Sequence, residues 1–212
     1  MDAVEPQAHT RIMNAKGQRH QGECLLTWEW PRDIQHVYVY PYKPGEELAV
    51  EELLREHMKL VTREEYRASA GFREKSEFIG TRLYRLFPCV KEEGGLKLIA
   101  QLDQDNLVQI KGDRAQIRYS IQYGFHWFGK LKPAHIELFC EVNVPKGVLC
   151  YAKKPGSEPL SKDDGVMYMF GREFQQGRQK LPQFEVGRDE YVRVFLSDGK
   201  QYGDAFELIR EK

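Results

Sequence analysis

The chain has 212 residues and a mass of 24.8 kDa, which is enough for one large domain or two small ones. Apolar residues make up 41% of it and charged residues 30%, with a mean hydropathy of -0.62, so the composition is that of an ordinary soluble protein, not a disordered or membrane-embedded one. Lysines plus arginines equal aspartates plus glutamates, 32 against 32. This balance argues against a nucleic-acid or anionic-membrane binder, which normally carries excess positive charge.

The cysteines bear on the cellular compartment. Cys24, Cys89, Cys140 and Cys150 contain no CxxC pair, so no zinc site is expected. A secreted disulfide scaffold would be shorter and richer in cysteine, which favours reduced structural thiols over disulfides. The segment 1–19 lacks the apolar core of a secretory signal, and no stretch approaches the ~20 apolar residues of a membrane span. We therefore expect a cytoplasmic protein without a membrane span.

The first half of the chain begins with strand patterns of period two. The segment 24–30 alternates apolar with more polar residues and is ended by Pro31, which predicts a strand with one exposed face. The segment 36–42 places valines on one face and tyrosines, among them Tyr38 and Tyr40, on the other. This predicts a second strand that is partly covered on both faces. We interpret the tyrosine face as a packing face, with a binding platform as the alternative.

A helical pattern follows and interrupts the strand series. Strong helix formers fill the segment 46–60, which predicts a helical insertion. The residues that share one face of this helix are Val50, Leu53, Leu54, His57, Met58 and Val61. We interpret the helix as packed on its own sheet, and a partner-binding amphipathic helix is the alternative. Thr62 to Glu65 has the capping-box pattern and predicts a short helical turn that ends before Gly71.

Strand patterns then resume and continue to the end of the chain. The polar segment 102–112 is the predicted domain boundary, so we expect domains over 1–104 and 105–212. In the second domain the clearest alternation is at 116–123. Further strands are predicted near 136–142, 148–153, 166–170, 184–186, 191–196 and 206–209. About seven strands in roughly 100 residues, with turn signals between them, is typical of an immunoglobulin-like sandwich.

The first half also resembles a known family. The segment 25–31, Leu-Leu-Thr-Trp-Glu-Trp-Pro, followed by His-Val-Tyr-Val-Tyr at 36–40, resembles the second and third strands of fibronectin type III-like modules. The segments 61–66 and 70–72 look like the connection seen in divergent bacterial members of that family. The resemblance covers about residues 8–102, and the helical stretch 46–60 departs from the plain module. It implies binding, spacing or scaffolding and no shared catalytic residues.

No motif in the sequence points to catalysis. The six histidines form no HExxH or other close metal pair, and there is no GxSxG, Walker or GxGxxG motif. The acidic segments 103–106 and 163–165 are interpreted as turns, because neither continues into a calcium-binding loop. We therefore assign no catalytic residue, no metal ligand and no cofactor.

The unusual cluster in the sequence is an aromatic loop. Phe125, His126, Trp127 and Phe128 lie between two glycines after the strand 116–123. Loops seldom carry three aromatic residues without a use. We favour a joint between the two domains, because exposed apolar patches of this size are rare. The alternative is that Trp127 is exposed and stacks on a sugar ring or a partner side chain.

Together these patterns predict an all-β protein. We expect two immunoglobulin-like, fibronectin type III-like antiparallel sandwiches, the first with the helical insertion. The leading function is a non-catalytic interaction or scaffold module in a bacterial-type system, with a protein partner and no nucleic acid. A carbohydrate-binding accessory module is the alternative, and a glycan-active hydrolase is the enzymatic rival. The candidate binding residues are Phe125, His126, Trp127, Phe128, Tyr38 and Tyr40.

Overall fold

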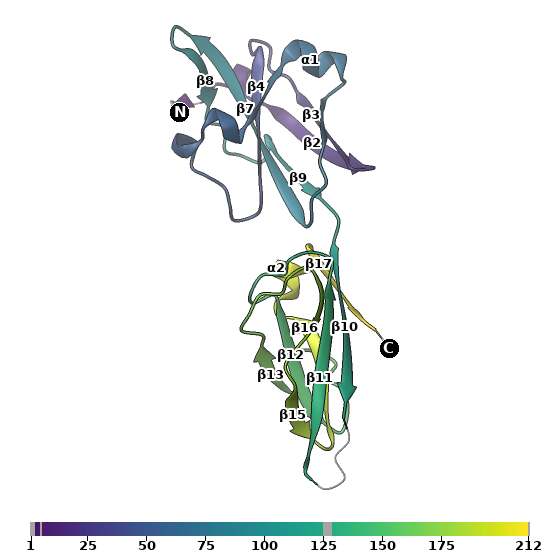
Figure 1. Ribbon diagram of the computed structural model, residues 1–212. Helices are drawn as coiled ribbons and strands as arrows, with labels where there is room; N and C mark the ends of the chain where they lie inside the picture. Colours follow the sequence, from purple (N-terminus) through teal and green to yellow (C-terminus); the bar gives the residue numbers. More distant parts are fainter. Residues whose placement is uncertain (1–2, 5, 125–128, 212) are drawn as a thin grey trace. The chain divides into compact units, whose positions relative to one another are not determined.

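The computed structural model describes residues 3–4, 6–124 and 129–211, and these residues are mostly β-strand (Figure 1). The predicted all-β class is therefore confirmed. The chain forms two compact units, unit 1 from Met1 to Asp113 and unit 2 from Arg114 to Lys212. The sequence-based boundary at 104 lies earlier than the one the fold adopts, because the strand after it still belongs to unit 1.

Unit 1 consists of short strands with a few single-turn helices between them. Its elements are β1 (Ala3–Val4), η1 (Ala8–Thr10), β2 (Met13–His20), β3 (Glu23–Glu29), β4 (His36–Tyr42), η2 (Val50–Glu52), η3 (Arg55–His57), β5 (Lys59–Thr62), α1 (Arg63–Ala68), β6 (Phe72–Lys75), β7 (Thr81–Glu92), β8 (Gly95–Ile99) and β9 (Leu107–Lys111).

Two sheets face each other in unit 1 across an apolar core. The larger sheet has the order β1-β8-β7-β4-β5, with β9 also paired to β7, and the smaller has the order β2-β3-β6. Every pairing is antiparallel except that of β1 with β8. The buried residues between the sheets include Cys24, Leu26, Trp28, Val37, Val39, Tyr84, Leu86 and Val108.

The strands predicted at 24–30 and 36–42 correspond to β3 and β4. In β3, inward residues such as Leu26 are fully buried and alternate with half-buried ones, so one face is exposed in part. In β4, Val37 and Val39 contribute to the core between the sheets, whereas Tyr38 belongs to a second buried cluster on the opposite face. The prediction that β4 is covered on both faces is confirmed.

The prediction of a helical insertion at 46–60 is wrong. The segment contains only the single 3-10 turns η2 and η3, and the residues that flank them have extended backbone. Val50, Leu53 and Met58 are buried over the tyrosine face of β4, but Leu54 is 54% exposed. The apolar spacing therefore reflects an irregular segment laid across a sheet and not the face of a helix. The capping box is confirmed, since α1 follows Thr62 directly.

Unit 2 is also built almost entirely from strands. Its elements are β10 (Ala115–Tyr123), β11 (Leu131–Cys140), β12 (Leu149–Pro155), β13 (Val166–Met169), β14 (Gly177–Lys180), β15 (Phe184–Gly187), β16 (Glu190–Leu196), α2 (Gly199–Tyr202) and β17 (Phe206–Arg210). The strand patterns of the second half therefore correspond to strands, and β14 is an additional one.

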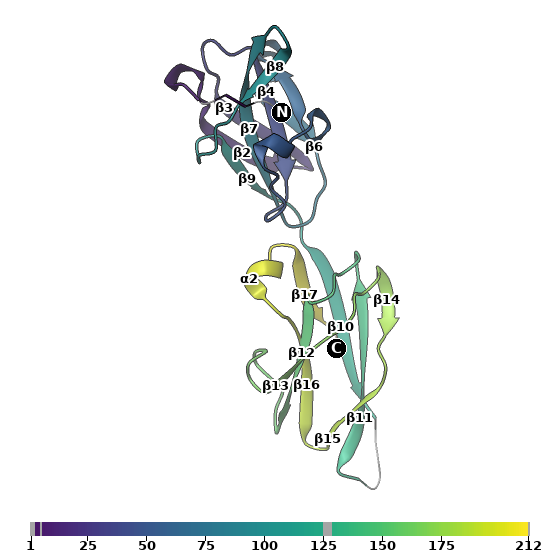
Figure 2. The same cartoon turned by 90° about the vertical axis from the view of Figure 1, so that its left-hand side faces the viewer.

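Two sheets again face each other in unit 2. One has the order β14-β11-β10-β17, with β15 also paired to β11, and the other has the order β13-β12-β16. Figure 2 shows β12, β13 and β16 on the left and β11 and β14 on the right. The core between them includes Ile117, Tyr119, Ile136, Leu138, Val192 and Val194. The last strand, β17, pairs in parallel with β10, the first strand of the unit.

All four cysteines are buried free thiols, in agreement with the expected reduced state. Within the described residues, no helix is long and apolar enough to cross a membrane.

Candidate functional site

The first predicted binding residues are those of the aromatic loop. Phe125, His126, Trp127 and Phe128 lie outside the described residues. The choice between a joint of the two domains and an exposed platform therefore stays a prediction.

The other predicted binding residues, Tyr38 and Tyr40, are buried. Their side chains are 5% and 4% exposed and belong to the buried cluster that also contains Val50, Leu53 and Met58. The Tyr40 hydroxyl accepts a hydrogen bond from the Leu48 amide at 3.1 Å, and its ring stacks on that of Tyr42 at 5.0 Å between centroids. Both tyrosines therefore act as packing residues in this fold and offer little surface to a ligand.

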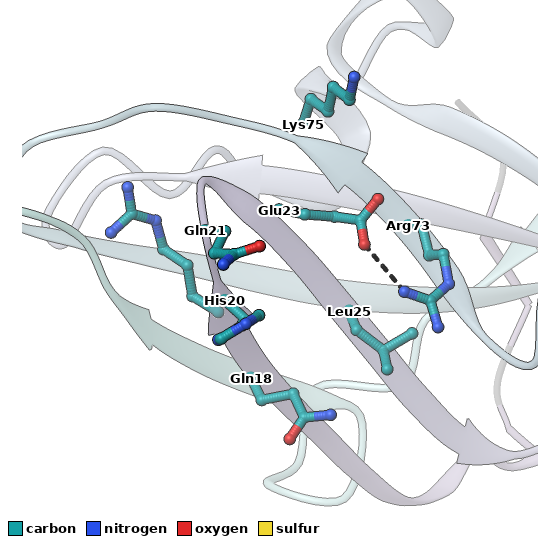
Figure 3. A pocket seen from close by; sticks show the side chains of 8 residues that line it. Gln18, His20, Gln21, Glu23, Leu25, Arg73 and Lys75 are labelled. Atoms are coloured by element: carbon teal, nitrogen blue, oxygen red, sulfur yellow. Dashed lines mark hydrogen bonds and ion pairs between the residues drawn. The ribbon is translucent and has the colours of Figure 1, made fainter.

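A depression with a volume of about 620 Å³ lies over the β2–β3 hairpin and β6 (Figure 3). Arg73 donates to Glu23 at 2.8 Å across it, and Leu25 lies beside this ion pair. Both charged side chains are more than a third exposed. A shallow polar hollow whose charges already pair in water offers little binding energy. We therefore do not place the functional site there.

A stronger candidate is the outer edge of β13, which we call the β13 edge and define as Val166 to Met169. All four residues are apolar and exposed, by 56%, 42%, 37% and 48% in chain order. Within the described residues, β13 pairs with β12 and with no other strand. An apolar strand with one unpaired side is a template for a further strand, and folded proteins usually protect such edges.

One face of the β13 edge rests on an aromatic cluster. Tyr168 lies opposite Tyr151 of β12, and their rings stack at 5.1 Å with an angle of 15° between planes. The Tyr151 ring also packs against the rings of Phe170 and Phe184, with centroid distances of 5.1 and 5.2 Å. The Lys153 ammonium lies 5.2 Å from the centre of the Tyr168 ring. The aromatic cluster holds Tyr168 in place although part of its ring is exposed.

The other face of the β13 edge carries the two methionines. Met167 lies opposite Ala152, and Met169 lies opposite Cys150. Both β12 residues are fully buried, whereas the methionines extend beyond them into solvent. The edge therefore offers apolar side chains on both sides of the strand. Methionine is a flexible, polarisable side chain that adapts to different partner surfaces.

The hydrogen-bonding direction of the backbone shows which groups remain free. The Phe170 amide donates to the Leu149 carbonyl of β12 at 3.3 Å. In an antiparallel pair, alternate residues direct both backbone groups toward the same neighbour. Tyr168 therefore directs its N–H and C=O toward β12, while Met167 and Met169 direct theirs outward. These outward groups are the ones available to a partner.

The start of β13 is fixed by a short loop. The Asp164 carboxylate accepts from the Leu160 amide and from the Lys154 ammonium, each at 2.9 Å, and these bonds lower its pKa. Gly165 follows with a φ of +138°, and a Cβ there would lie 2.4 Å from the Lys153 carbonyl oxygen. The loop thus brings the chain against β12 at the first residue of β13.

A further feature of the described residues is the state of their metal-ligating and thiol groups. No three His, Cys, Asp or Glu side chains in that part of the chain are grouped as metal ligands. Burial raises the pKa values of the Cys140 and Cys150 thiols and raises that of Cys89 to about 12, so these thiols stay protonated at neutral pH. What the β13 edge offers is unpaired backbone and apolar surface, which is the chemistry of binding.

Comparison with known proteins adds no further constraint: no protein-family model matches the sequence, and no curated protein matches it.

Sequence reasoning predicted the strand at 166–170 but not its importance. The available signal was an uninterrupted apolar run, Val-Met-Tyr-Met-Phe, between Gly165 and Gly171. Such a run is typical of a fully buried strand, and only the arrangement of the sheets places it at an edge.

Proposed function

We propose that this protein is a non-catalytic interaction module made of two immunoglobulin-like, fibronectin type III-like sandwiches, and that it binds its partner through the β13 edge. The observation that carries the proposal is the exposure of all four apolar residues of an edge strand. Strand addition is a common mode of protein recognition, in which the backbone provides affinity and the side chains provide specificity.

The order of the strands supports the sandwich assignment. In unit 1, β2 and β3 lie in one sheet, β4 and β5 in the other, β6 in the first, and β7 and β8 in the second. Unit 2 repeats this alternation up to its last strand: β10 and β11, then β12 and β13, then β14 and β15, then β16. Pairs of strands that alternate between two facing sheets are typical of immunoglobulin-like folds.

The proposal is tested with peptides selected from a random library displayed on phage, using the intact chain as bait. We expect extended apolar peptides that protect the Met167 and Met169 amides from hydrogen exchange. Met167→Pro removes one outward N–H and should weaken binding about tenfold. Leu54→Lys changes an apolar residue of unit 1 that is 54% exposed and should leave binding unchanged. Peptides that bind Met167→Pro as tightly as the parent chain would refute the proposal.

The carbohydrate-binding alternative makes a different prediction. A sugar would stack on an exposed ring and would not need the strand's backbone. A glycan titration followed by tryptophan fluorescence would then respond to Trp127→Ala and not to Met167→Pro.

A further inference from the structure

We infer that the partner of the β13 edge is a second copy of this chain, which pairs with it antiparallel about Tyr168. The inference rests on the proposed function and names its partner. The edge needs an extended strand that is apolar on both faces and has free backbone groups on one side. β13 itself has these properties, since Val166 and Tyr168 lie on one face and Met167 and Met169 on the other.

Two-fold symmetry restricts the register of such a pair. Two identical antiparallel strands that continue one sheet must place some residue opposite its own copy. If that residue is Tyr168, Met167 lies opposite Met169 of the second copy, and their outward N–H and C=O groups meet. If it is Met167, the outward groups of Met169 face Gly165, where the φ of +138° departs from strand geometry. The backbone therefore favours a centre at Tyr168 over one at Met167.

The aromatic rings favour the same centre. Tyr168 already stacks on Tyr151 of the neighbouring strand, with a centroid distance of 5.1 Å. Neighbouring strands lie ~4.8 Å apart. Tyr168 of the second copy would therefore extend the stack across the interface, and the result is a row of four tyrosines. The position opposite Tyr168 is also a non-hydrogen-bonded one, at which side chains approach more closely.

The charges at the two ends of β13 favour antiparallel pairing. Asp164 precedes the strand and Arg172 follows it, and a centre at Tyr168 places these two residues opposite each other. The Arg172 guanidinium lies 5.6 Å from the Phe174 ring, and no described carboxylate forms an ion pair with it. Antiparallel pairing brings the acidic end of one copy to the arginine of the other, whereas parallel pairing brings like charges together. The net charge of the chain is zero, so two copies do not repel each other at long range.

The first experiment measures the association of the intact chain by sedimentation velocity over a range of concentrations. One strand pair is a small interface, so we expect a dimer that dissociates in the micromolar range. Met167→Pro should raise the dissociation constant of the dimer at least tenfold. Met169→Lys should have the same effect and serves as the test if the proline variant does not fold. Leu54→Lys should dimerise as the parent chain does.

The second experiment tests the register through a disulfide. Residues opposite each other at a non-hydrogen-bonded position have Cα atoms ~4.5 Å apart, within the range for a disulfide. Tyr168→Cys should therefore form a covalent dimer when oxidised glutathione is added, and Val166→Cys, which faces Phe170 of the second copy, should not. The native thiols are buried and do not compete. Arg172→Glu, which places a carboxylate opposite Asp164 of the second copy, should weaken the dimer.

The outcomes separate this inference from the proposed function. A parent chain that stays monomeric, or a dimer that survives both Met167→Pro and Met169→Lys, overturns the self-pairing. If library peptides still depend on Met167 in that case, the edge binds a different protein and the proposed function stands. If neither peptides nor a second copy depend on Met167, both fail. A covalent dimer of Val166→Cys, with none of Tyr168→Cys, overturns the register.

Discussion

The edge strands β5 and β13 hold corresponding places in the two units, but β5 carries a charged residue at its edge and β13 carries none. Each comes directly after its pairing partner in the chain, β4 or β12, and pairs with it antiparallel at a sheet edge. In β5, the first residue is Lys59, whose ammonium contacts the Glu74 carboxylate at 2.6 Å, and α1 begins directly after the strand. In β13 there is no charged residue at all.

Of the two edges, β5 is the one that the fold protects. Glu74 lies on β6, in the sheet that faces β5, so its ion pair with Lys59 joins the margins of both sheets. A charged side chain at an edge opposes the addition of another strand. The other edge strand of the β13 sheet, β16, carries Glu190 and Arg193. The unprotected state of β13 is therefore a property of that strand and not of the unit as a whole.

The largest effect is expected from removing the turn that holds β13. Gly165→Ala forces a Cβ into the Lys153 carbonyl at an unfavourable φ, and we expect a loss of about 3 kcal/mol from the free energy of unfolding. Gly156→Ala is the matched control, because Gly156 has a φ of +81° but open space around the added atom. It should cost about 1 kcal/mol. Urea unfolding measures both, and equal losses would show that the contact with β12 is unimportant.

A smaller effect is expected from removing the protection of β5. Lys59→Met leaves the Glu74 carboxylate, whose side chain is 12% exposed, without its cation. We expect a loss of about 1 to 2 kcal/mol and new concentration-dependent association through β5. Lys75→Met, an exposed lysine on β6, should change stability by less than about 0.5 kcal/mol. If Lys59→Met combined with Met167→Pro stays as monomeric as Met167→Pro alone, the protective role of Lys59 is contradicted.

The sequence patterns that succeeded were those in which a strand shows its own burial. The alternation at 24–30 and 116–123 reports one buried and one exposed face, and it identified β3 and β10. The sequence did not predict β2, because β2 is mostly exposed and shows no apolar alternation. It did not predict β9, because β9 follows a polar segment that resembles a linker. The helical spacing at 46–60 failed because side chains of an irregular segment can cover a sheet at similar intervals.

The candidate site was beyond sequence reasoning for a related reason. The apolar run of β13 looks the same whether the strand is central or at an edge, and its neighbours in space are fixed by pairings with residues far away in the chain. The sequence correctly indicates that Tyr38 and Tyr40 form a packing face, but it wrongly predicts a helix for the segment that covers them.

The cap of α1 provides a third test of how the end of β5 is closed. The Thr62 hydroxyl accepts from the Glu65 amide at 3.2 Å, while the Glu65 carboxylate accepts from the Thr62 amide at 2.8 Å. Thr62→Ala should lower the free energy of unfolding by about 1 kcal/mol, and Thr62→Ser, which keeps the hydroxyl, should lower it much less. Equal losses in urea unfolding would show that α1 is held by packing instead of by its cap.

The smallest effect concerns the loop that precedes β13 and depends on pH. The Leu160 amide and the Lys154 ammonium hold the pKa of Asp164 below its ordinary value of 3.8, so the ionised carboxylate is the form that the fold favours. The contribution of Asp164 to stability is therefore fully present above pH 3.8 and is lost as the pH falls through the lower folded value. The effect is small because Asp164 is partly exposed to water, which screens its interactions. The amide shift of Leu160, followed by NMR during acidification, should report this titration in the parent chain and not in Asp164→Asn. A midpoint at or above 3.8 would mean that the loop does not depend on the charge, and the start of β13 would then be held by Gly165 alone.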